Sequence, residues 1–177
     1  MCLIIVEGID RVGKTTLINK LHEKYNIPVF DDKYLKFNAI VNKNEFIQVK
    51  TNKTDIKSSI INIERMNSLT NYLSQFGVQQ NILIDRFHVS EYVYSKVERN
   101  FDGFEAFKII DDRLSKIGTI IIYVRHVDLD FSSSEHGKDL NRHAKEFDKI
   151  MLETKCRLYL TNYNLIDKFV CEFGEII

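Results

Sequence analysis

Several features that mark other protein classes are scarce in this sequence of 177 residues. It has one proline, no tryptophan and three cysteines, Cys2, Cys156 and Cys171, none of them in a CxxC pair. The odd number and wide spacing of the cysteines argue against a disulfide framework or a zinc knuckle. No apolar run approaches the roughly 20 residues that a membrane span needs, and the run 2–6 is too short for the core of a signal peptide. We therefore expect a cytoplasmic protein with reduced thiols and no membrane partner.

An excess of charge is also missing. Lys and Arg together number 25, as do Asp and Glu, and 44% of the residues are hydrophobic. Proteins that coat nucleic acid or anionic membranes rely on an excess of cations, so we expect no stable nucleic-acid partner. The composition also argues against a disordered chain or a coiled coil. The length fits a single domain that spans residues 1–177.

Short apolar runs alternate with amphipathic segments along the chain. The predicted buried strands are Leu3–Val6, Pro28–Phe30, Ile82–Ile84 and Thr119–Val124, with a weaker fifth candidate at Phe169–Phe173. Helical periodicity appears over residues 15–24, 56–76 and 104–114, and more loosely around Phe147, Met151 and Leu158. This order predicts an α/β fold, a three-layer sandwich with a mostly parallel five-stranded sheet. Residues 31–54 show no clear period, and residues 132–142 are expected to form a surface loop.

The most informative segment, residues 8–15, reads Gly-Ile-Asp-Arg-Val-Gly-Lys-Thr. It fits the phosphate-loop pattern G-x-x-x-x-G-K-[ST] without a mismatch, and it lies between a predicted strand and a predicted helix. The glycines allow backbone N–H groups to converge on an anion, and the helix N-terminus favours a polyphosphate. Lys14 is expected to reach the β- and γ-phosphates and Thr15 to hold Mg²⁺. The predicted nucleotide-binding residues are Gly8, Asp10, Arg11, Val12, Gly13, Lys14, Thr15 and Thr16.

A second candidate site follows the third apolar run, where the sequence reads Asp85-Arg86-Phe87. Ligands of open α/β sheets bind beyond the carboxyl ends of the strands, so Asp85 is expected to face the phosphate loop and to hold a metal-bound water. The alternative is a purely structural aspartate that caps the next helix and pairs with Arg86.

The two segments together resemble the thymidylate kinases. The resemblance rests on Glu7-Gly-Ile-Asp-Arg-Val-Gly-Lys-Thr-Thr16 and on Asp85-Arg86-Phe87 followed by Ser90 and Tyr94. It covers the first half of the chain well and the second half only by the order of elements. It implies an ATP- and Mg²⁺-dependent kinase in which Lys14, Arg11, Asp85 and Arg86 are catalytic. It also implies substrate contacts from Asp10, Arg65, Arg86, Ser90 and Tyr94, with Arg65 at the base and Arg86 at the acceptor phosphate.

The resemblance further implies a short lid over ATP at about residues 126–142. Arg142 is its candidate nucleotide contact, whereas a solvated loop predicts the same composition. Because the lid has no dense arginine cluster, Arg11 in the phosphate loop is expected to reach the transferred phosphoryl group. The amphipathic stripe over 56–76 could also serve a homodimer, although burial within one chain explains it equally well.

The acceptor stays open at this point. Thymidylate kinases usually carry an F-P-x-R-like element after the second strand, but here the sequence reads Phe30-Asp-Asp-Lys-Tyr34. The leading hypothesis is phosphoryl transfer to a deoxynucleoside monophosphate, dTMP-like, giving the diphosphate. Asp31 or Asp32 could instead act as a base for a nucleoside 5′-hydroxyl, as in deoxynucleoside kinases. Further alternatives are a kinase for groups within DNA, a non-catalytic nucleotide-binding regulator, and a GTPase suggested by N-K-x-D at 52–55, which we interpret as a chance match.

Overall fold

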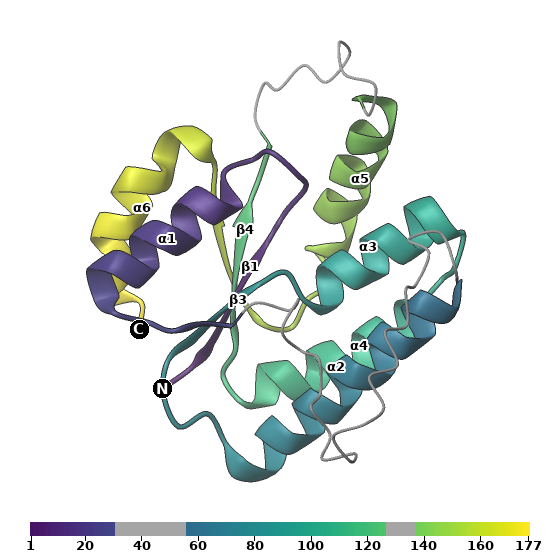
Figure 1. The fold of residues 1–177 in the computed structure, drawn as a ribbon, viewed down its shortest axis with the longest axis horizontal. Helices are drawn as coiled ribbons and strands as arrows, with labels where there is room; N and C mark the ends of the chain where they lie inside the picture. The colour runs from purple at the N-terminus through teal and green to yellow at the C-terminus, as the bar shows by residue number, and fades with distance from the viewer. Residues whose placement is uncertain (31–55, 127–136) are drawn as a thin grey trace, which may run out of the picture.

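The computed structural model of the chain describes residues 1–30, 56–126 and 137–177. Its centre is a five-stranded sheet in the order β2-β3-β1-β4-β5. The strands are β1 (Leu3–Glu7), β2 (Val29–Phe30), β3 (Ile82–Asp85), β4 (Ile120–Val124) and β5 (Arg157–Thr161). Every neighbouring pair is parallel (Figure 1). All carboxyl ends therefore meet at one edge of the sheet, which confirms the predicted α/β architecture.

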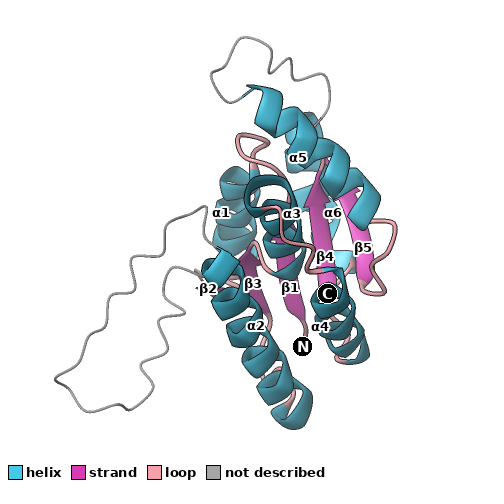
Figure 2. Ribbon diagram, turned by 90° about the vertical axis from the view of Figure 1, so that its right-hand side faces the viewer, coloured by secondary structure: helices cyan, strands magenta, loops and turns pink. Residues whose placement is uncertain are grey.

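Helices cover both faces of the sheet and form the outer layers (Figures 1 and 2). One face carries α1 (Lys14–Tyr25) and α6 (Ile166–Glu172), which contact each other. The other carries α2 (Ile56–Phe76), α3 (His88–Arg99), α4 (Phe104–Lys116) and α5 (Gly137–Ile150). Two short 3₁₀ turns, η2 (Tyr163–Leu165) and η3 (Phe173–Glu175), flank α6.

Apolar periodicity explains why these segments pack as they do. The central strands β1 and β4 are buried along their whole length, as continuous apolar runs in a doubly covered parallel sheet should be. Helix α1 buries Leu17, Ile18 and Leu21 against the sheet. It ends at Asn26, whose left-handed backbone (φ 52°) is a common way to stop a helix. The expected helices over 15–24, 56–76 and 104–114 are confirmed as α1, α2 and α4.

Two expectations for the second half were wrong. Phe169–Phe173 is not a strand, because it lies in α6 and η3, where Phe169, Val170 and Phe173 share a buried helical face. The fifth strand is β5, which includes Leu158, a residue assigned above to a helical pattern. Residues 137–142 begin helix α5 and do not continue the expected loop, while 127–136 lie outside the described part of the chain.

The three thiols lie in different environments, and none is in a disulfide. Cys2 is half-buried, Cys156 is buried and Cys171 is exposed on α6. Burial raises the pKa of Cys156 far above its ordinary value. Within the described ranges, no helix is both long enough and apolar enough to cross a membrane.

Candidate active site

The phosphate loop forms a tight turn between β1 and α1 at the carboxyl edge of the sheet. Gly8 and Gly13 have positive φ angles of 142° and 94°. A Cβ atom would lie 2.5 Å from the carbonyl oxygen of Val124 at position 8, and 2.8 Å from the ring of Tyr163 at position 13. Both positions therefore require glycine on conformational and on steric grounds. The strand, turn and helix expected around this motif are all present.

The first turn of α1 is open to an anion. Its N-cap is Gly13, no side chain caps the helix, and no acidic residue lies in its first turn. The side chains of Thr15 and Thr16 are exposed there. Unpaired N–H groups and the helix dipole together favour a bound phosphate.

Lys14 is buried beside this turn, with 6% of its surface exposed. Its Nζ donates a hydrogen bond to the carbonyl oxygen of Ile9 at 2.5 Å. Burial, and next the positive charge of Arg86, lower the pKa of Lys14 to about 8, although nearby carboxylates oppose the shift. A polyphosphate would supply the missing counter-charge and hold this amine in its charged form.

Arg86 joins the two predicted sites. Its guanidinium forms an ion pair with Asp10 of the phosphate loop. The same group lies over the ring of Tyr94, 5.2 Å from the ring centroid, a cation–π contact. Burial tends to raise the pKa of Asp10, but the charge and hydrogen bond of Arg86 outweigh it and lower that pKa. Asp10, Arg86 and Tyr94 are thus brought together, as expected for one site, while their substrate contacts stay predictions.

Asp85, at the end of β3, has a buried carboxylate oxygen, Oδ1, that accepts no hydrogen bond from any described residue. An orphaned acceptor of this kind fits a ligand such as Mg²⁺ or a metal-bound water, both of which take oxygen donors. The exposed hydroxyl of Thr15 supplies the second predicted ligand. These two residues suit a magnesium site, which stays a prediction.

Arg11 and Arg86 share an unusual backbone conformation, with φ angles of 67° and 66°. A bulky residue pays about 1 kcal/mol or more for a left-handed conformation, and such strain tends to gather at functional sites. Arg11 is exposed and pairs with none of the residues that the structure describes. Its predicted reach to the transferred phosphoryl group therefore meets no competing partner in the described protein.

Ser90 and Glu7 form a contact that sequence reasoning did not find. Ser90 is buried, and its hydroxyl donates to Glu7 Oε2 and does not face an open surface. Glu7 ends β1 and is fully buried. Burial raises the pKa of Glu7 although the Ser90 hydroxyl opposes this shift. In the sequence, Glu7 could have been recognised as a carboxylate at the end of an otherwise apolar strand, because a buried charge needs partners.

Among the described residues, Arg65 and Arg142 form no ion pair or hydrogen bond with the groups above, although His143, next to Arg142, packs against the Tyr94 ring. Arg65 is exposed on α2, off the side of the helix that buries Met66, Thr70 and Leu73. Arg142 is exposed on α5, in a helix and not in the expected loop. Asp31, Asp32, the N-K-x-D segment and most of the expected lid lie outside the described residues.

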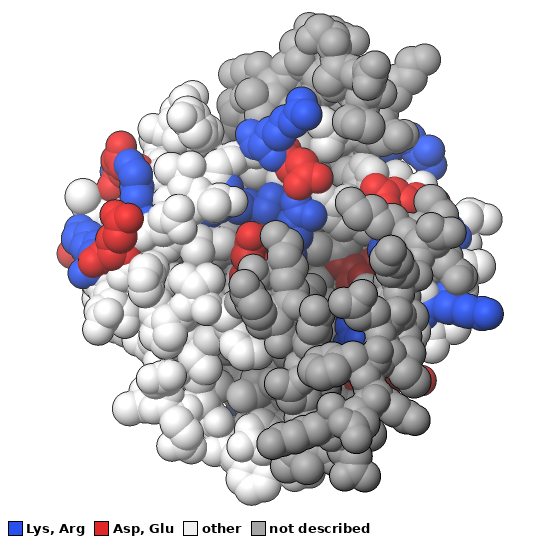
Figure 3. All heavy atoms as spheres, viewed as in Figure 1, with Lys and Arg blue, Asp and Glu red and all other residues white. Residues whose placement is uncertain are grey.

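Charged side chains of both signs lie near the site. In Figure 3, basic and acidic side chains lie next to one another in the upper part of the face, toward the carboxyl ends of the strands. Arg86 and Asp10 form one pair of opposite charges at the site. A neutral protein thus presents local cationic groups where the phosphate loop opens.

No protein-family model and no curated protein sequence matches this chain. Solved structures do. The YorR protein of Bacillus subtilis, in complex with phosphorylated GDP, matches with a TM-score of 0.66 at 19% identity, over 98% of this chain and 94% of that one. Deoxyadenosine kinase from M. mycoides, with products dCMP and a flexible dCDP bound, matches with a TM-score of 0.58 at 16% identity, over 98% and 97%. Thymidylate kinase from Candida albicans matches with a TM-score of 0.58 at 19% identity, over 99% and 90%.

These matches extend over almost the whole chain, including the second half, where the sequence resemblance rested on the order of elements. Because the sequence identities are below 20%, the similarity lies in the arrangement of the backbone and not in the side chains. The chain has the fold of the thymidylate kinase-like P-loop nucleotide kinases.

Proposed function

We propose that this protein is a kinase that transfers the γ-phosphoryl group of ATP to a deoxynucleoside monophosphate. The observation that carries the proposal is the meeting of two anion-binding elements at one sheet edge. The uncapped N-terminus of α1 with Lys14 suits the donor polyphosphate. Arg86, held by Asp10 over Tyr94, suits a second phosphate on the acceptor.

In the proposed reaction an oxygen of the acceptor phosphate attacks the γ-phosphorus, and the bond to the β,γ-bridging oxygen breaks to leave ADP. The protein's part is to position the reactants and to stabilise spreading negative charge. Lys14 neutralises the donor phosphates, Arg11 reaches the transferred group and Arg86 orients the acceptor. Asp10 holds Arg86 in place until the acceptor binds.

Mg²⁺ would be held by Thr15 and Asp85, and when bound it supplies charge neutralisation on the phosphate oxygens. The orphaned Oδ1 of Asp85 is the structural support for this assignment. The other proposed contacts with the phosphates come from side chains of the protein and from the N–H groups at the start of α1.

The test is direct. The purified protein is incubated with radiolabelled ATP and MgCl₂, with each deoxynucleoside monophosphate and, separately, with each deoxynucleoside, and products are separated by chromatography. We expect a diphosphate product from at least one monophosphate. Phosphorylation of nucleosides alone would replace this proposal with a deoxynucleoside kinase.

Two variants identify the source of the activity. Lys14→Ala removes a charge from the transferring phosphates and should lower turnover by about 1,000-fold, a change of about 4 kcal/mol. Lys20→Ala, which removes an exposed α1 lysine paired with Asp167, should leave turnover within about twofold of the parent protein. Near-normal turnover in Lys14→Ala would contradict the role assigned to Lys14. No product with any acceptor would refute the proposed function.

A further inference from the structure

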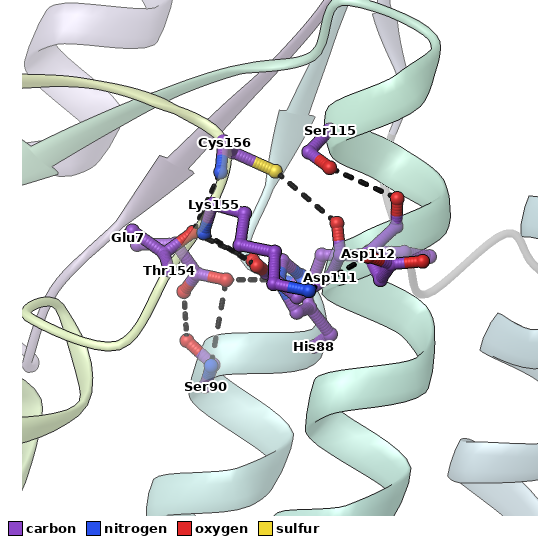
Figure 4. A network of polar contacts seen from close by, with 10 residues as sticks. Glu7, His88, Ser90, Asp111, Asp112, Ser115, Thr154, Lys155 and Cys156 are labelled. Carbon is purple, nitrogen blue, oxygen red and sulfur yellow. Dashed lines mark hydrogen bonds and ion pairs between the residues drawn. The ribbon is translucent and has the colours of Figure 1, made fainter.

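Glu7 is a buried carboxylate that joins two separate parts of the site. Its exposed fraction is 0%, and it is the last residue of β1, directly before the phosphate loop. Oε1 accepts hydrogen bonds from the backbone N–H of Phe87, at 2.9 Å, and of Ser90, at 3.4 Å. Oε2 accepts from the Ser90 hydroxyl. Figure 4 shows Glu7 and Ser90 facing each other across the start of α3.

This carboxylate caps α3 from another element. The residue before α3 is Phe87, which provides no side-chain cap. The first N–H groups of a helix need acceptors, and a negative charge there is favoured by the helix dipole. Glu7 meets both needs across a separation of about 80 residues in the chain.

The capped turn is the one that carries the strained Arg86. The N–H of Arg86 donates to the carbonyl oxygen of Val6 at 2.9 Å, which continues the pairing of β1 with β3 by one residue. The next residue, Phe87, is fixed by its N–H on Glu7 and by a ring that is 1% exposed. The left-handed Arg86 therefore lies between anchored groups, and its guanidinium extends to Asp10. A conformation that costs about 1 kcal/mol persists only where its surroundings enforce it.

We propose that Glu7 is a positioning residue, which holds the turn at 85–87 so that Arg86 is presented to Asp10 and to the acceptor. Ser90 acts through Glu7 and does not contact the substrate. This inference rests on the proposed function for its catalytic consequence, but the effect on Arg86 itself is independent of any reaction.

Stability alone does not account for a carboxylate at this place. The other four residues of β1 are apolar and equally buried. Glu7 forms no ion pair with a described residue, and the charges of Lys14 and Arg86 offset only part of the free energy that burying a carboxylate costs and an apolar side chain avoids. The carboxylate instead fixes the position of the turn, because Oε1 holds the N–H groups of Phe87 and Ser90 at a set place relative to β1.

The first part of the test measures the conformation of Arg86 and does not depend on enzyme activity. Crystal structures of Glu7→Leu and of Ser90→Ala are compared with the parent protein, and exchange of the Arg86 Nη2–H protons, which donate to Asp10, is followed by NMR. We expect Arg86 to leave the left-handed conformation or to separate from Asp10 in Glu7→Leu, with faster exchange. An unchanged φ, ion pair and exchange rate in Glu7→Leu would overturn the proposal.

The second part of the test measures kcat. Glu7→Leu should lower kcat by about 100-fold through misplacement of Arg86. Glu7→Gln, which keeps an acceptor oxygen for Phe87, should recover part of the loss. In an Arg86→Ala background Glu7→Leu should change kcat by about twofold or less, because residues that act through one group are not additive. A full second loss in that background would overturn the proposal.

Glu91→Leu is the matched control. Glu91 is also a buried carboxylate on α3, and it accepts from Asn62, Ser95 and Arg99, away from the phosphate loop. It should lose stability while kcat stays within about threefold. If Glu7→Leu does not fold, Ser90→Ala takes its place in both parts, with an expected kcat loss of about tenfold. If the parent protein phosphorylates no acceptor, the proposed function fails and the first part still decides the role of Glu7.

Discussion

Arg11 and Arg86 have nearly the same backbone conformation but opposite surroundings. Both have φ angles close to 66°, and both lie at the carboxyl edge of the sheet. Arg86 is half-buried, paired with Asp10 and stacked on Tyr94. Arg11 is exposed, and no side chain in the described ranges holds it. One arginine is thus positioned before any ligand binds, whereas the other is left for the ligand to position.

This difference between the two arginines determines at which stage of the reaction each one can contribute. A prepositioned cation stabilises developing charge without reorganising when the reaction occurs. A free arginine loses side-chain entropy at the moment it engages, so its contact contributes only where the ligand draws it in. We therefore expect Arg86 to serve binding and turnover, and Arg11 to serve the transition state.

Of the two arginines, Arg86 is expected to show the larger effect when it is replaced by alanine. It removes the guanidinium proposed to hold the acceptor phosphate, and kcat/KM for the acceptor should fall by about 100- to 1,000-fold. Steady-state kinetics with varied acceptor at saturating ATP measure this. Arg113→Ala is the control, because Arg113 also holds a side-chain partner, Asn67, but does so on α4 away from the site. Equal kinetics for the two variants would show that Arg86 has no role at the acceptor.

Arg11→Ala should have a smaller and more selective effect. We expect kcat to fall by about 10- to 100-fold while the KM for ATP changes by less than about threefold, the pattern of an interaction made in the transition state. Thermal stability should be unchanged, because no described side chain loses a partner. A change confined to the KM for ATP would make Arg11 a ground-state binding residue and would remove the contrast with Arg86.

A third measurement separates the two arginines through Lys14, whose pKa of about 8 is lowered by burial and then by Arg86. A larger fraction of Lys14 is neutral at pH 8.5 than at pH 7, and bound ATP favours its charged form, so binding should take up more proton at pH 8.5 than at pH 7. Calorimetry in buffers of different ionisation enthalpy measures the uptake. Arg86→Ala should raise the pKa of Lys14 and reduce the uptake, whereas Arg11→Ala should not. Equal uptake at both pH values would mean that Lys14 is already charged.

The smallest effect concerns strain. At φ 67° glycine avoids a cost of about 1 kcal/mol that alanine pays, less the extra entropy of the unfolded chain. Urea denaturation should therefore find Arg11→Gly more stable than Arg11→Ala by about 0.5 kcal/mol. Arg86→Gly should instead be less stable than the parent protein, because it also loses the Asp10 pair. The reverse order at position 11 would remove the strain argument.

The parts of the site that are local in the chain were predictable. In the phosphate loop only the six residues 8–13 separate a strand from a helix, so a short sequence pattern determines nearly all of its geometry. Asp85 and Arg86 could be placed because strands of a parallel sheet end at one edge. Glu7 was part of the quoted motif but received no role, because its partners Phe87 and Ser90 lie about 80 residues away.

The fold shows the same division between local and distant information. The central strands are uninterrupted apolar runs and were found without difficulty. The edge strand β5 is partly exposed, so its pattern Arg-Leu-Tyr-Leu-Thr resembles many surface segments. Phe169–Phe173 is as apolar as a strand, but its side chains fit a helix that packs on α1. Whether such a segment forms a strand or a helix is decided by the residues that pack against it in the folded protein.

The distribution of thiols gives the protein a natural attachment point. Cys156 is shielded and its pKa is raised, and Cys2 is half-buried with a pKa that burial also raises, so thiolate chemistry is suppressed at both. Cys171 is exposed on α6, the helix that contacts α1 through the Tyr25 hydroxyl on Val170. A fluorophore attached at Cys171 would lie on the opposite sheet face from α3, beside the end of α1 at Tyr25. Labelling at Cys171 would therefore leave Glu7 and Arg86 undisturbed.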